Sequence, residues 1–200
     1  MGFNPSAFPG VLPPGQGGTG VISQTTTWLP ADNLLQYASG PMDAYQSGSA
    51  ALTAGTVYLV RVNITKGGTV SNIYWPVAAA ATGASTQSFA GLYNAAGTLL
   101  TGSADQTAPL STATPTLCPL TTTQVLPAGG FVWAALLTNF ATTQPTIFRT
   151  GGAGSLTFYD AFLGAGSFRY ATHNVGGLTA LPGTVTPTSA AAIPLFAGLS

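Results

Sequence analysis

The sequence TVYLVRVNITKGGTVSNIYWPVAAAATGASTQSFAGLYNAAGTLL, residues 56–100, contains successive strand patterns with little sequence between them. Every even position from Tyr58 to Ile64 is apolar, whereas Arg61 and Asn63 lie at odd positions. Such a period of two is typical of a strand that buries one face and exposes the other. Arg61 and Asn63 therefore mark the predicted solvated face.

Two antiparallel hairpins are predicted in this stretch. Residues 69–77 alternate again after the turn signal Gly67-Gly68, so we expect them to pair with the preceding strand. The segment FAGLYNAAGTLL, residues 89–100, has turn residues at Asn94–Gly97 between two apolar runs. Together the two hairpins predict an all-β scaffold.

The C-terminal half adds further strand candidates joined by irregular segments. Residues 131–138, FVWAALLT, are nearly all apolar, which is typical of a central strand buried on both faces. Residues 102–119 are rich in Thr, Ala, Pro and Ser and are predicted to form a long irregular connection. The other expected strands span residues 120–126, 146–149, 168–170 and 193–197. About eight short strands with such links predict an antiparallel β-sandwich, with a jelly roll as the favoured form.

Residues 1–50 form a separate unit in this interpretation, ahead of a sandwich domain at residues 51–200. Pro and Gly cluster there and the apolar residues follow no sustained period, so the segment cannot build a core of its own. We expect an extended arm that anchors the protein to a neighbour. A short helix is predicted at Asp32–Ser39, before the stop signal Gly40-Pro41. The predicted anchoring side chains are Phe3, Phe8, Val11 and Trp28.

Charged residues are scarce, since they make up 4% of the chain, against roughly 25% in ordinary soluble domains. The formal net charge is zero, so the chain has no basic surface for nucleic acid and copies repel one another weakly. We therefore expect a homo-oligomer without a nucleic-acid partner. Apolar runs such as Phe131–Leu137 are far shorter than the ~20 residues of a membrane helix. The absence of Lys and Arg before Arg61 argues against an ordinary signal peptide, so neither a membrane partner nor export is expected.

The sequence contains no pattern that predicts catalysis, a metal site or a cofactor. Cys118 is the only cysteine, and a single cysteine is most often a small packing residue. His173 is the only histidine and has no spacing that defines a catalytic triad. GQGGTG at Gly15–Gly20 matches a dinucleotide fingerprint but lacks the flanking strand and helix that bind a pyrophosphate. The prediction is a protein that is not an enzyme.

Aromatic residues leave a carbohydrate-binding alternative open. Tyr159, Phe168 and Tyr170 lie in or beside a Gly-rich stretch and would form a stacking platform for glycans if their rings were exposed together. Trp75 and Trp133 lie in predicted strands, where burial is expected. The alternative therefore depends on the exposure of the first three rings.

Three segments resemble a family of small virion proteins from tailed phages of actinobacteria. They are LTAGTVYLVRVNI at Leu52–Ile64, FAGLYNAAGTLL at Phe89–Leu100 and LPAGGFVWAALLTN at Leu126–Asn139, and residues Phe168–Pro187 are also similar. The resemblance covers most of the chain from Leu52 onward. It implies a non-enzymatic structural β-sandwich on the surface of the phage particle, with other virion proteins as partners, either as a capsid decoration or as a minor tail or fibre protein.

The GQGGTG sequence also resembles a short GGTG element of trimeric phage fibre proteins. This resemblance implies a trimer rather than a dimer. In the carbohydrate-binding alternative, the same particle context implies a receptor-recognition module of a tail fibre that binds a host surface glycan.

Overall fold

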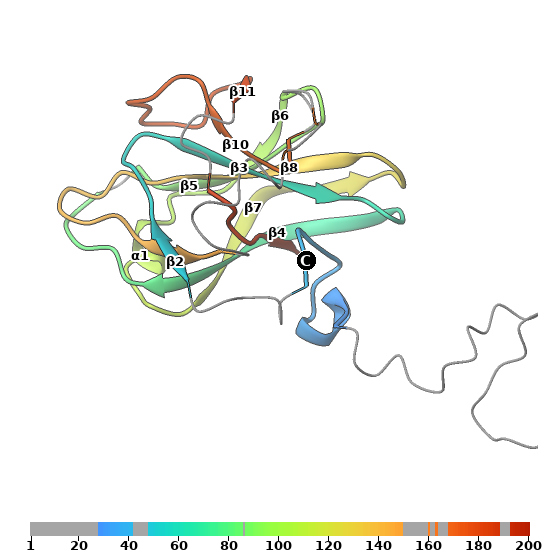
Figure 1. Cartoon of the computed structure of the whole chain (residues 1–200), viewed down its shortest axis with the longest axis horizontal. Helices are drawn as coiled ribbons and strands as arrows, with labels where there is room; N and C mark the ends of the chain where they lie inside the picture. Colours follow the sequence, from blue (N-terminus) through green and yellow to red (C-terminus); the bar gives the residue numbers. More distant parts are fainter. Residues whose placement is uncertain are drawn as a thin grey trace, which may run out of the picture.

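The computed structural model describes residues 28–41, 48–85, 87–149, 160, 163, 168–188 and 193–200. The predicted contact residues Phe3, Phe8, Val11 and Tyr159 lie outside these residues. Regular secondary structure in the described residues is almost all β-strand, with a short α-helix, α1 (Thr107–Leu110), and a 3-10 helix at Pro30–Asn33 (Figure 1). The strands are β1 (Tyr37–Ala38), β2 (Ser49–Ala51), β3 (Val57–Asn63), β4 (Gly68–Ala79), β5 (Phe89–Tyr93), β6 (Leu99–Gly102), β7 (Pro115–Leu126), β8 (Phe131–Leu137), β9 (Thr146–Phe148), β10 (Tyr170–His173), β11 (Pro187–Thr188) and β12 (Gly198–Leu199).

Strands β2 to β9 form two antiparallel sheets that pack face to face. One sheet has the order β2-β9-β4-β7 and the other has the order β3-β8-β5-β6. Consecutive strands alternate between the sheets except at β5 and β6, which is the connectivity of an eight-stranded jelly roll. β10 and β11 extend the second sheet, and β1 and β12 join the first through β4. The predicted all-β antiparallel sandwich is confirmed.

One of the two predicted hairpins is confirmed and the other is wrong. β5 pairs with β6 across the Asn94–Gly97 turn, as expected. β3, however, pairs with β8 and β10, whereas β4 belongs to the opposite sheet. The link between β3 and β4 crosses from one sheet to the other, and it is bonded to the neighbouring link between β7 and β8. Ile64 N–H donates to Gly130 O at 3.1 Å, and Gly129 N–H donates to Ile64 O at 2.8 Å. A Gly-Gly turn signal does not distinguish such a crossing from a hairpin.

The β3-β8 sheet is buried on both faces. Its inner face contributes Val60 and Leu136 to a core that it shares with Trp75 of β4. Its outer face contributes Leu59 and Trp133 to a second cluster, which is covered by side chains of residues 168–185. Strand β8 pairs with β3 on one side and β5 on the other, so the predicted central strand is confirmed.

Residues 28–41 are part of the sandwich, so the predicted boundary at residue 50 is wrong. In β1, Tyr37 pairs with Leu199 of β12, and its hydroxyl donates to Lys66 O at 2.8 Å. Leu35 is buried against Gly198. β2 also pairs with β9, so residues 49–51 belong to the first sheet. Two-residue strands such as β1 are too short to produce a readable period.

The helix predicted at Asp32–Ser39 is also wrong. A single 3-10 turn forms at Pro30–Asn33, and the Asp32 carboxylate accepts the Leu29 N–H at 2.9 Å. Leu34 then adopts a left-handed conformation, with φ of 59°, which ends the turn. Backbone donors beyond it bond to the last strand instead, because Gln36 N–H reaches Leu199 O at 2.7 Å. Pairing with β12 replaces the hydrogen bonds that a helix would have made.

Candidate functional site

The aromatic platform predicted for glycans is not present among the residues that the structure describes. Tyr170 is only 1% exposed and belongs to the core between the sheets, where β10 pairs with β3. Phe168 is partly buried and packs against the cluster on the outer face of β3 and β8. A ring buried in this way cannot stack on a sugar, so the prediction for Tyr170 is wrong.

Trp28 contacts its own domain. Its indole N–H donates to Asn33 Oδ1 at 2.7 Å, and its ring meets the ring of Phe196 edge-on, with 6.5 Å between centroids. Phe196 in turn meets Tyr74 edge-on at 5.9 Å. Trp28 therefore fixes the point at which residues 1–27 join the sandwich, beside Tyr74 of β4.

The polar residues considered for chemistry have structural contacts. His173 Nδ1 accepts the Thr186 N–H at 3.0 Å, and Asp105 Oδ1 accepts the Ser88 N–H at 3.0 Å. Cys118 is fully buried, and burial raises the pKa of its thiol to about 12. Across the described ranges no group of three or more His, Cys, Asp or Glu side chains is placed to hold a metal ion. Each of these residues therefore has a role in the fold.

An apolar groove on the outer face of the first sheet is the strongest candidate site. It consists of two hollows, of about 400 Å³ and 300 Å³, that share Tyr74 and Pro115. None of its lining side chains carries a charge, and we call it the outer groove. Its lining residues are Asn33, Leu34, Leu35, Tyr74, Pro76, Val77, Ala78, Ala113, Pro115, Leu117, Phe148 and Ser200.

The outer groove arises because two neighbouring strands turn apolar residues outward. On β7 the outward residues Pro115 and Leu117 alternate with the buried residues Thr116 and Cys118. A solvated sheet face normally carries polar side chains, and the next outward position of β7 beyond Pro119 is indeed Thr121. Two of the four outward apolar residues of β7, Pro115 and Leu117, therefore line the groove, whereas Pro119 and Val125 are exposed outside it.

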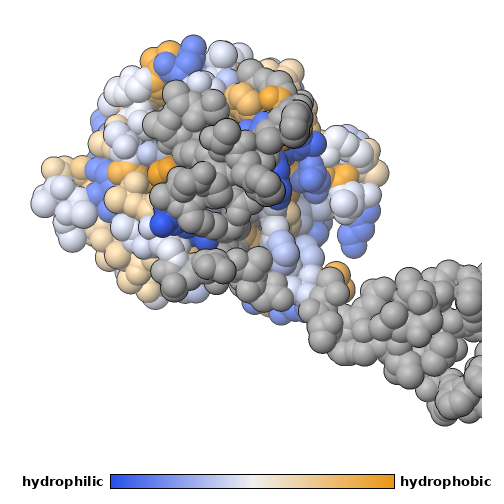
Figure 2. Space-filling model, viewed as in Figure 1, coloured by the Kyte–Doolittle hydropathy of each residue, from blue (hydrophilic) through white to orange (hydrophobic). Residues whose placement is uncertain are grey.

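Several large apolar side chains of the outer groove are accessible to a partner. Leu34 is 89% exposed, Leu117 is 52% exposed and Phe148 is 37% exposed. Contiguous exposed apolar residues of this kind commonly mark an interaction surface. Hydrophobic residues reach the surface among hydrophilic ones on the face shown in Figure 2.

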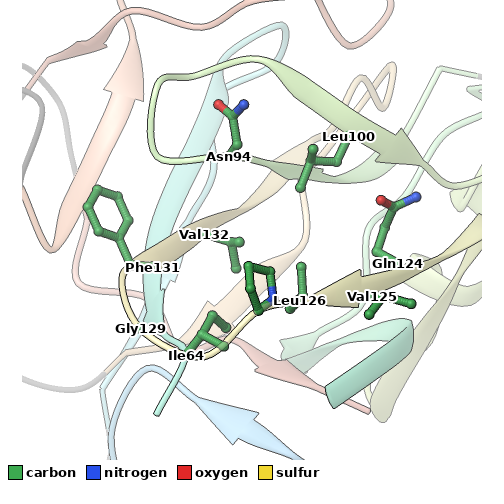
Figure 3. Close-up of a pocket in the computed structure, with 10 residues that line it drawn as sticks. Ile64, Asn94, Leu100, Gln124, Val125, Leu126, Gly129, Phe131 and Val132 are labelled. Carbon is green, nitrogen blue, oxygen red and sulfur yellow. The ribbon is translucent and has the colours of Figure 1, made fainter. Parts of the chain in front are cut away.

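A second candidate is a cleft of about 210 Å³ at the end of the sandwich, which we call the end cleft (Figure 3). It opens between the β5-β6 hairpin of one sheet and the end of β7 in the other, so its walls come from both sheets. Asn94 and Gln124 lie at its sides, above the apolar side chains of Ile64 and Val132. The Asn94 amide oxygen accepts the Thr98 N–H at 2.9 Å, and the Gln124 amide nitrogen donates to Thr122 O at 3.4 Å. The remaining lining residues are Leu100, Val125, Leu126, Pro127, Gly129 and Phe131. Amides over an apolar floor can bind a small polar ligand such as a sugar ring.

Sequence reasoning missed both surfaces. The signal for the outer groove was present in residues 115–119, PTLCP, where Pro and Leu alternate with Thr and Cys. The composition of the surrounding stretch, which is rich in Thr, Ala, Pro and Ser, predicts an irregular connection there, and this prediction is wrong for the part that forms β7. The end cleft has no sequence signal, because it joins strands that are distant in the chain.

No protein-family model matches the chain, and a search of curated proteins finds no significant relative. Among the described residues, no helix has the length and apolar character required to cross a membrane. The fold therefore defines the class of this protein, an antiparallel jelly-roll sandwich, and the function is inferred from its surfaces.

Proposed function

We propose that this chain is a non-enzymatic structural protein of a tailed bacteriophage particle, positioned on the particle surface as a capsid decoration or as a minor tail or fibre protein. The observation that carries the proposal is the uncharged outer groove, together with the resemblance of Leu52–Ile64, Phe89–Leu100 and Leu126–Asn139 to virion proteins. A permanent assembly can cover such a surface.

The energetics favour burial of the outer groove in an assembly. Covering a Leu or Phe side chain completely contributes about 1.5–3 kcal/mol, and Leu34, Leu117 and Phe148 are all substantially exposed. The chain has only four basic and four acidic residues, so little long-range repulsion opposes association. The burial free energy and the low charge support a homo-oligomer, and the GGTG element favours a trimer. Other virion proteins are the further partners in this proposal.

The location of the protein on intact particles tests the proposal. Particles of the phage that encodes this chain are purified and their protein composition is measured. Gold-labelled antibody against the sandwich is then imaged on them. We expect the chain in stoichiometric amounts and the label at one defined position, on either the capsid or the tail. Purified particles that lack the chain would contradict the structural role.

The end cleft supports a second candidate function, a carbohydrate-binding module that recognises a host glycan. Its amide groups and apolar floor suit a sugar ring, whereas the platform of Phe168 and Tyr170 does not form. Binding of the purified protein to host surface glycans would be lowered about tenfold or more by Gln124→Ala and left unchanged by Gln87→Ala, since Gln87 is exposed outside the cleft. Equal binding by both variants would exclude the end cleft.

A further inference from the structure

The outer groove suits a particular kind of occupant, an extended and uncharged apolar chain. Its walls are formed by the rings of Tyr74 and Phe148, by Pro76 and Pro115, and by Leu117. Grooves walled by aromatic rings and proline bind proline-rich segments in the polyproline II conformation, because such segments lose little entropy on binding. An uncharged groove gives no selectivity for a charged peptide.

The chain itself contains a segment with this chemistry. Residues 1–27 include four prolines and the apolar residues Phe3, Phe8, Val11 and Leu12, and no charged side chain. These residues lie outside the described part of the structure, and the described chain starts at Trp28. Every copy of the protein therefore carries one such segment and one outer groove.

Trp28, which directly follows the segment in the chain, lies at the rim of the groove. Trp28 donates a hydrogen bond to Asn33, which lines the groove, and contacts Phe196, which packs on Tyr74 in the groove wall. The polar residues 23–27 separate Trp28 from the last apolar pair, Val21-Ile22. Six residues of extended chain reach at most about 20 Å, which is long enough for the apolar part of the segment to enter the groove of a neighbouring copy.

We propose that the outer groove of each copy binds the proline-rich segment of residues 3–22 from a second copy of this chain. Passing the segment to a neighbour in one direction closes a ring, in which every groove is filled. This inference deepens the structural role proposed above and rests on it, because it names the partner of the same apolar surface. The exchange also covers the exposed apolar side chains of the outer groove in every copy, so the assembled ring presents no open apolar groove to solvent.

Cross-linking between two full-length variants tests the exchange. Val11→Cys and Ala113→Cys are produced in separately tagged full-length chains, co-expressed and treated with a short flexible bismaleimide. Ala113 is an exposed residue of the groove, and the native Cys118 is buried, so it does not compete for the reagent. We expect a covalent dimer that contains both tags. Replacing the second variant by Val175→Cys, which is exposed away from the groove, should remove most of that product.

The oligomeric state provides an independent measurement. Full-length Leu117→Lys should weaken self-association at least tenfold in light scattering, whereas the matched change Val175→Lys should leave it unaltered, with circular dichroism confirming that both remain folded. A wild-type monomer, or cross-linking only within a double variant Val11→Cys/Ala113→Cys, would overturn the inference. These outcomes concern the purified protein, so they are independent of whether the chain is found on phage particles.

Discussion

Replacing Leu35 by alanine distinguishes a structural N-terminal segment from a separate arm. The Leu35 side chain is 5% exposed and lies so close to Gly198 that a Cβ there would meet Leu35 Cδ1 at 2.6 Å. Truncation of a leucine at such a site costs about 2–5 kcal/mol, because the transfer free energy is lost and a cavity remains. That loss is a large fraction of a typical stability of about 5–15 kcal/mol.

The matched control is Leu29→Ala, in the same segment. Leu29 is 57% exposed, so its truncation should change the free energy of unfolding by no more than about 0.5 kcal/mol. Guanidinium denaturation followed by tryptophan fluorescence measures both variants, since Trp75 and Trp133 are fully buried in the native state. The midpoint should fall for Leu35→Ala with an unchanged m-value.

Equal and small effects of the two substitutions would refute the reasoning. They would mean that residues 28–41 do not contribute to the core in solution, and that a boundary near residue 50 is correct after all. A reduced m-value for Leu35→Ala would instead mean that the native or denatured state had changed, and the comparison of free energies would no longer apply.

Two further predictions concern the backbone and the buried thiol. Gly97→Ala should lower the free energy of unfolding by about 1–3 kcal/mol more than Gly129→Ala does, as measured by thermal melts. Both glycines have a positive φ, but only at Gly97 would an added Cβ collide with the Val185 carbonyl oxygen. Cys118 should resist alkylation in the native state. Burial raises the pKa of its thiol from 9.0 to about 12, so between pH 9 and 12 the thiol ionises in the unfolded chain but not in the folded one. Stability should therefore fall as the pH rises through this range, and it should fall less in Cys118→Ala. Rapid native alkylation, or pH profiles that coincide, would contradict this account of the thiol.

The sequence predicts the strands of the central region well because their periodicity is local. Residues 57–63 and 131–137 are recognisable as strands from their local apolar pattern, and the turn at Asn94–Gly97 lies between two strands that pair. The solvated face predicted at Arg61 and Asn63 is wrong, because Val57 and Leu59 on that face are buried in the second cluster. Pairing between distant strands has no comparable local signal. The order β3-β8-β5-β6 depends on contacts across the whole chain, which explains why the hairpin expected between β3 and β4 is absent.

The predicted contact residues show why exposure is difficult to infer from residue type. Tyr170 has the same aromatic character whether it faces a ligand or the core, and its burial depends on β10 pairing with β3. The role of Trp28 likewise depends on Phe196, which lies close to the other end of the chain. Neither contact can be derived from the residues that flank these positions.

The strand that sequence analysis missed also identifies the candidate site. The composition of residues 102–119 predicts an irregular connection, but the first half of β7 forms there, with Thr116 and Cys118 inside and Pro115 and Leu117 outside. Local rules fail most often where a protein gives up the usual pattern for an interaction. In the second half of the same strand Thr121, Thr122 and Thr123 are exposed, together with Val125. Pro115 and Leu117 share one hollowed surface with Tyr74 of the neighbouring strand, so an occupant of the outer groove explains their exposure better than a general tolerance of exposed hydrophobic residues does.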